Sequence, residues 1–183
     1  MAEQNTNSSF WASPEAEPKR SYKYLAVWGD KSIPWFVISS VDLPKAETGE
    51  AKTYALNHTF KWPGRITWND ISMEITDSEK LDCAKVLVDK LIKSGYSYPE
   101  NPTIYRTISK QGAIAAFGGS LTIYEITWDE KIIGAWKLKN AWVKSFELGK
   151  KAYESDDPQK ISLNITYDWA FYDVSEKGNP VSG

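Results

Sequence analysis

The feature that most constrains the fold of this sequence is a two-residue alternation of apolar and polar side chains, which recurs along the chain. The longest run covers residues 161–171, and a second clean run covers residues 51–62. Successive side chains of a β-strand point to opposite faces of a sheet, so this period indicates strands with one apolar and one polar face. In the second run the apolar face is predicted to hold Tyr54, Leu56, His58, Phe60 and Trp62.

Other segments with the same character extend the predicted sheet. Further strands are predicted at residues 22–28, 33–43, 121–128 and 131–138. Turns or loops are predicted at residues 29–32, 45–50, 63–64 and 129–130, where glycine, proline and charged residues gather. The first and the last of these would each close a hairpin. Between residues 66 and 76 the apolar parity changes at Asn69-Asp70, which indicates either a β-bulge or a turn.

One segment has the pattern of an amphipathic helix, at about residues 77–94. Thr76 and Glu79 have the spacing of a capping box, and Gly95 stands where a helix commonly ends. Residues 106–117 fit either a short second helix or a strand. The predicted fold class is therefore mainly β (β-rich α+β), an antiparallel β-sandwich or barrel with one flanking α-helix.

Length and composition fit one globular domain. The chain has 183 residues, 42% of them hydrophobic, and we expect a single β domain at 22–173 between an N-terminal arm at 1–21 and a C-terminal tail at 174–183. A formal net charge of −2 gives no excess of positive charge for binding nucleic acid. The sequence shows neither a secretion signal nor an apolar run long enough to cross a membrane. The single cysteine and the single histidine fit a chain made and kept in a reducing cytoplasm.

The residues that usually carry catalysis are scarce. The single histidine, His58, lies among apolar neighbours and is predicted to be a half-buried core residue, whereas Cys83 is predicted to be an inert packing residue inside the helix. The acidic pairs 129–130 and 156–157 fall in predicted turns, where solvated side chains are the common outcome. We therefore expect no enzyme activity, no cofactor and no metal site.

The order of the segments resembles that of the tail tube proteins of contractile-tailed bacteriophages. The resemblance rests on a strand ending at Leu43-Pro44 and on the step from Gly64-Arg65 to Asn69-Asp70. It continues with an alternating strand that runs into the acid-led helix, residues 71–79, and with an Asp-rich turn before the last long strand, residues 156–169. It spans roughly residues 22–173.

This resemblance implies a structural virion protein. Six subunits would close into a ring with a shared inner β-barrel, and rings would stack into a rigid tube inside a contractile sheath. The implied partners are further copies of the chain, the sheath protein, and the baseplate and tail-terminator proteins. DNA would pass through the lumen without specific binding. The protein would belong to the virion, with assembly in the cytoplasm of the host bacterium.

The segments that carry the resemblance also supply candidate interface residues. The charged residues at 45–50 are expected to contact a neighbouring subunit or ring. Phe10-Trp11 is expected to anchor the N-terminal segment, residues 1–21, on the same or another subunit. The candidate subunit-interface residues are Phe10, Trp11, Lys45, Glu47, Glu50, Gly64, Arg65, Asn69 and Asp70.

Two alternatives remain open at the level of the sequence. One is a tube initiator of the baseplate, or a tube subunit of a related contractile injection or secretion system. The other is a tryptophan-rich carbohydrate-binding β-sandwich, which would stack sugars on exposed tryptophans. Trp35, Trp62 and Trp169 follow the apolar parity, which favours a place in the core or in an interface.

Overall fold

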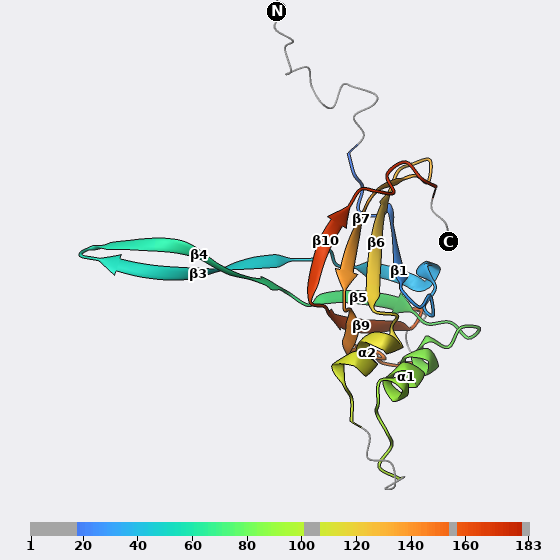
Figure 1. Cartoon of the computed structure of the whole chain (residues 1–183). Coiled ribbons are helices and arrows are strands. Elements are labelled where there is room, and N and C mark those ends of the chain that lie inside the picture. Colours follow the sequence, from blue (N-terminus) through green and yellow to red (C-terminus); the bar gives the residue numbers. More distant parts are fainter. Residues whose placement is uncertain (1–17, 101–106, 154–156, 181–183) are drawn as a thin grey trace, which may run out of the picture.

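Two four-stranded antiparallel sheets form the body of the protein. The computed structural model describes residues 18–100, 107–153 and 157–180. Sheet A has the order β1 (Tyr24–Trp28), β6 (Ser120–Ile126), β7 (Ile132–Lys139) and β10 (Trp169–Asp173). Sheet B has the order β2 (Ile38–Val41), β5 (Ile71–Thr76), β9 (Lys160–Thr166) and β8 (Trp142–Glu147). The strands of the two sheets run across each other, with the helices at one end (Figure 1).

The core lies between the sheets and follows the predicted alternation. Ile71, Met73 and Ile75 of β5 are at most 2% exposed, and the apolar positions of β9 are equally buried beside them. Leu121 and Ile123 of β6 enclose the core from sheet A. The prediction of a mainly β, antiparallel fold is confirmed. Within the described residues neither sheet closes into a barrel, so β1, β10, β2 and β8 are edge strands.

In the described part of the chain two helices flank the sheets, α1 (Cys83–Lys93) and α2 (Lys110–Ala116). The predicted helix is confirmed, but it begins at Cys83 rather than near residue 77. The Asp77 carboxylate accepts hydrogen bonds from the amides of Ser78 and Cys83, and Asp82 accepts one from the amide of Lys85. Aspartates therefore hold residues 77–82 in a capping turn. The ambiguous segment at 106–117 contains the second helix, α2.

The prediction of a hairpin at residues 29–32 is wrong. Strand β1 pairs with β6, and β2 pairs with β5, so the chain crosses from sheet A to sheet B between them. The predicted strand at 33–43 shortens to β2, because a 3₁₀ turn, η2 (Trp35–Val37), precedes it. The hairpin predicted around residues 129–130 is confirmed by the antiparallel pair β6–β7.

The longest alternation, residues 161–171, is divided between the sheets. Strand β9 belongs to sheet B and β10 to sheet A, and the corner between them lies at Tyr167-Asp168. The Asp168 carboxylate accepts hydrogen bonds from Lys110 at 2.8 Å and Asn140 at 2.6 Å, which fixes the corner. The parity inverts there, so Trp169 is 47% exposed although the pattern placed it on the apolar face.

A buried ion pair ties α1 to the turn after β1. The Lys90 side chain is 4% exposed, and its Nζ pairs with the carboxylate of Asp30. The same Nζ donates to the carbonyl oxygen of Ala116 at 2.6 Å and lies 4.6 Å from the centroid of the Phe117 ring. A single ammonium therefore joins α1, the end of α2 and the β1 turn.

Candidate assembly interface

A long β-hairpin projects from the body and is the most prominent exposed element. Strands β3 (Ala46–Ala55) and β4 (His58–Trp68) pair antiparallel and are joined at Leu56-Asn57. We call residues 46–68 the arm; in Figure 1 it extends away from both sheets. Every residue from 46 to 67 is exposed. Isolated two-stranded hairpins are marginally stable in water, so the exposed arm is a candidate contact surface.

The arm corrects three predictions. Residues 45–50 are not a loop, because all but Lys45 belong to β3. The chain does not turn at Pro63-Gly64, which lies inside β4, and the run 51–62 is interrupted by the turn at Leu56-Asn57. Pro63 is tolerated because a two-stranded ribbon leaves one edge of each strand unpaired, where a missing N–H costs no ladder hydrogen bond.

Two glycines face each other where the register of the arm shifts. Thr48 pairs with Ile66 and Glu50 with Pro63, so Gly49 alone stands opposite two residues, Gly64 and Arg65. A bulge of this kind increases the local twist of the ribbon. A Cβ on Gly64 would lie 2.9 Å from the backbone carbon of Gly49, whereas a Cβ on Gly49 would meet its nearest atom at 3.3 Å.

The bulge gives a matched pair of substitutions. Gly64→Ala is expected to shift the backbone of the arm, because the added Cβ would lie too close to the Gly49 backbone, at a cost above about 1 kcal/mol, as for alanine at a glycine site that cannot accept it. Gly49→Ala should cost less because its closest contact is longer. Hydrogen exchange of the β3 and β4 amides checks the order. Equal protection in the two variants would contradict this account of the bulge.

The two faces of the arm differ in character. Residues directly paired across an antiparallel ribbon share a face. One face, here called the aromatic face, is made by Ala51, Thr53, Ala55, His58, Phe60 and Trp62. On the opposite face the Glu50 carboxylate forms ion pairs with the ammonium groups of both Lys52 and Lys61, each at 3.3 Å. The arm is therefore amphipathic, with apolar rings on one side and charges on the other.

This arrangement revises the prediction for the 51–62 run. His58, Phe60 and Trp62 do share a face, but Tyr54 lies on the charged face because the turn separates the strands. His58 is exposed rather than half-buried in the core. Phe60 is 52% exposed and Trp62 is 59% exposed. Alternation alone does not distinguish an apolar face that meets its own core from one that meets another molecule.

Polar contacts hold the base of the arm. The Asn69 side chain donates to Glu47 at 2.9 Å, and the Asn69 amide donates to the carbonyl oxygen of Lys45 at 3.0 Å. Asp70 accepts from Lys144 at 2.7 Å and from Thr166 at 2.8 Å. Asn69-Asp70 is thus the joint at which the chain leaves the ribbon and enters sheet B, which explains the change of parity there.

The contacts of Asp70 predict a pH dependence. The hydrogen bond from Lys144 holds the pKa of Asp70 below its usual value, partial burial opposes this, and Thr166 adds to it. A depressed folded pKa stabilises the fold above the unfolded pKa of about 3.9, and this stability is lost as pH falls through the folded pKa.

Asp70→Asn should therefore lower the Tm at pH 7. The loss in free energy of unfolding should be less than about 1 kcal/mol, because the Asp70–Lys144 pair is partly exposed. The difference between the variant and the original protein should shrink as pH falls below the unfolded pKa and vanish below the depressed folded pKa of Asp70. Thermal unfolding followed from pH 7 to pH 2.5 measures it. A difference that persists unchanged at the lowest pH would mean that the carboxylate charge is not involved.

Most of the predicted interface residues gather on this one element. Glu47, Glu50, Gly64 and Arg65 lie in the arm, and Lys45, Asn69 and Asp70 lie at its base. Phe10 and Trp11 fall outside the described residues. The aromatic face was missed because its parity was assigned to the core. A signal was available: the apolar run sits beside a strand rich in charged residues.

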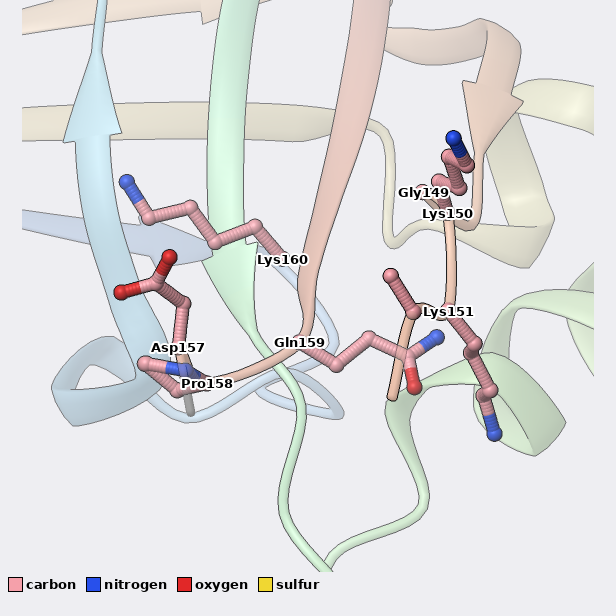
Figure 2. Close-up of a pocket in the computed structure, with 8 residues that line it drawn as sticks. Gly149, Lys150, Lys151, Asp157, Pro158, Gln159 and Lys160 are labelled. Carbon is pink, nitrogen blue, oxygen red and sulfur yellow. The ribbon is translucent and has the colours of Figure 1, made fainter. Parts of the chain in front are cut away.

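The hollows of the described surface do not bring catalytic groups together. One hollow, of about 770 Å³, lies between residues 149–152 and 157–160. Figure 2 shows Lys150 and Lys151 pointing in different directions, with Lys160 on the far side of the hollow. Among the described residues no group of three or more His, Cys, Asp or Glu side chains is placed to hold a metal ion.

Burial raises the pKa of the Cys83 thiol, which disfavours its thiolate.

Solved structures with a similar fold come from contractile injection systems. No protein-family model and no curated protein sequence matches the chain. A chain from the sheath/tube terminator of the extracellular contractile injection system PVC superposes with a TM-score of 0.63 at 18% identity, over 86% of this chain and 97% of that one. A chain from the PVC sheath-tube complex gives a TM-score of 0.58 at 16% identity, over 92% and 97%. The chain has the tail tube fold.

A third structure, the tube-terminating cap of the anti-feeding prophage, has a TM-score of 0.63 at 12% identity and covers 86% of this chain and 91% of that one. The resemblance predicted from the order of segments is thus confirmed for the tail tube fold. Among the described residues no helix is long and apolar enough to span a membrane.

Proposed function

We propose that the protein is a tube subunit of a contractile tail. Six copies close into a ring, and rings stack into a rigid tube inside a contractile sheath. The observation that carries this proposal is the fully exposed amphipathic arm on a subunit with the tail tube fold. A ring also covers strand edges that a free subunit would expose, which removes a common route to aggregation.

The outward face of sheet B is proposed as the wall of the lumen. Cross-strand pairs align Ser40, Glu74, Ser162 and Glu147 in one row, and Ser72, Asn164 and Ser145 in the next. The Lys160 Nζ lies 3.4 Å from the Glu74 carboxylate at the edge of this face. Hydroxyl and amide groups without an excess of cations let a polyanion pass with little binding, which supports DNA as the transported molecule.

The particle is proposed to be a phage virion, assembled in the cytoplasm of the host bacterium, with sheath, baseplate and terminator proteins as partners. Solved chains with this fold come from sheath-tube, terminator and baseplate structures. A tube subunit and a terminator differ in whether rings continue to stack. Electron microscopy of the purified protein at high concentration tests this: hollow tubes are expected, while single rings that never stack would favour a terminator.

A further inference from the structure

A groove lies at one edge of the sandwich, next to exposed aromatic side chains. A groove of about 550 Å³ runs between the free edges of β1 and β2, at the open side of the sandwich. Tyr24 and Ala26 of β1 and Ile38 and Val41 of β2 line it. Residues of the 3₁₀ turn η2 rim the groove at the end of β2 away from the arm.

The rim of this groove is aromatic and exposed. Tyr22 is 66% exposed, Trp35 is 49% exposed and Phe36 is 67% exposed. The rings of Trp35 and Phe36 meet edge to face, with centroids 6.0 Å apart. Aromatic clusters with this exposure on a soluble protein mark contact surfaces.

The groove differs in charge from four other hollows of the described surface. None of the residues that line it is charged. Lysines line the hollow of Figure 2, and acidic side chains line two further hollows, at Glu74 and at Asp77. The small hollow between the helices and β8, about 100 Å³, includes Lys144. The lining is apolar or aromatic apart from Ser21, Ser39 and Ser40, so it suits a ligand that is uncharged along the face that enters the groove.

The aromatic face of the arm has this chemistry. It presents the rings of His58, Phe60 and Trp62 beside the small side chains of Ala51 and Thr53, and it carries no Asp, Glu, Lys or Arg. Its charged side would remain in water. The edge strands β1 and β2 also offer unpaired backbone groups, to which an extended strand can add by hydrogen bonding.

The arm points away from the β1–β2 groove of its own subunit, so a contact between the two surfaces joins different copies, head to tail. In Figure 1 the arm leaves on one side of the body, and η2, the light-blue turn beside β1, lies on the other. A protrusion and its receptor on opposite sides make a heterologous contact, which repeats from copy to copy and closes into a ring when the rotation allows.

We propose that the aromatic face of the arm docks into the β1–β2 groove of a second copy of this chain. This rests on the proposed assembly function and assigns the two surfaces that meet. Each subunit then buries the aromatic side chains of its arm and covers its own open sandwich edge with the arm of a neighbour.

Site-specific photocrosslinking tests the pairing. p-Benzoylphenylalanine placed at Phe60, in a mixture of isotopically light and heavy protein, should crosslink between copies to residues 21–41. The same probe at Thr53, on the same face, gives a second opportunity if the first variant assembles poorly. A probe at Thr59, on the charged face, is the matched control and should not reach the groove.

A substitution provides an independent readout. Phe36→Glu places a charge in the groove at an exposed position and should raise the concentration needed for assembly at least tenfold, while Tyr153→Glu, at another exposed aromatic residue, should not. Rings or tubes whose crosslinks from Phe60 and Thr53 map elsewhere would overturn the groove and leave the assembly function standing. Absence of any assembly from the original protein would reject both.

Discussion

Replacing residues 47–67 by an Asn-Gly turn is expected to yield a folded monomer that no longer assembles. Ala46 and Trp68 pair at the base of the arm, so a two-residue turn can join them. Trp68 packs against the core, with its ring centroid 6.0 Å from that of Tyr167, so the variant retains Trp68. The removed residues are exposed and contribute little to the core. Circular dichroism and thermal unfolding check the fold, and sedimentation checks assembly.

A matched variant keeps the arm and changes only its tip. Leu56 has a φ of +52° and is fully exposed, so Leu56→Asn with Asn57→Gly supplies a sequence suited to a hairpin turn. This variant should assemble as the original protein does. Tubes formed by the armless protein would show that the arm is dispensable. A shorter deletion of residues 45–50 is not equivalent, because it would leave residues 63–68 of β4 without their partners while the outer half of the hairpin could still pair.

The second large effect is expected at Lys90. Lys90→Ala leaves Asp30 without its partner and removes the donor to the carbonyl oxygen of Ala116. Breaking a buried pair costs about 3–5 kcal/mol, and the 27% exposure of the Asp30 side chain points to the lower end because water can reach it. A loss of about 3 kcal/mol corresponds to a decrease in Tm of about 6–12 °C.

Lys93→Ala is the control for Lys90→Ala. Both residues are in the last turn of α1, but Lys93 is exposed. Its removal should change stability by no more than about 0.5 kcal/mol. Calorimetry of the two variants measures the difference. Equal losses would show that the helix end needs positive charge in general rather than this buried contact.

The sequence predicted best the strands that bury one face in their own core. β5 and the first part of the 161–171 run have apolar residues at alternate positions, and those residues are buried. The corner at Tyr167-Asp168 was not predictable from the pattern, since the alternation continues through it while the exposed face changes. The crossing from β1 to β2 was missed for a related reason: a Gly-Asp turn beside two strands is also the signature of a hairpin.

The arm was only partly predictable. Its charged residues were placed at an interface because they lie between strong strands. Its turn was assigned to Pro63-Gly64, where the residues favour one, while the actual turn forces Leu56 to a positive φ that leucine rarely adopts. The aromatic face was assigned to the core, since a subunit sequence does not separate burial within a chain from burial between chains.

We propose that six copies of this chain close into a ring. Native mass spectrometry of the purified protein at increasing concentration tests it most directly. A dominant species at six times the 20.7 kDa subunit mass is expected, followed by multiples of that ring. A 20.7 kDa monomer that persists at every concentration would contradict it.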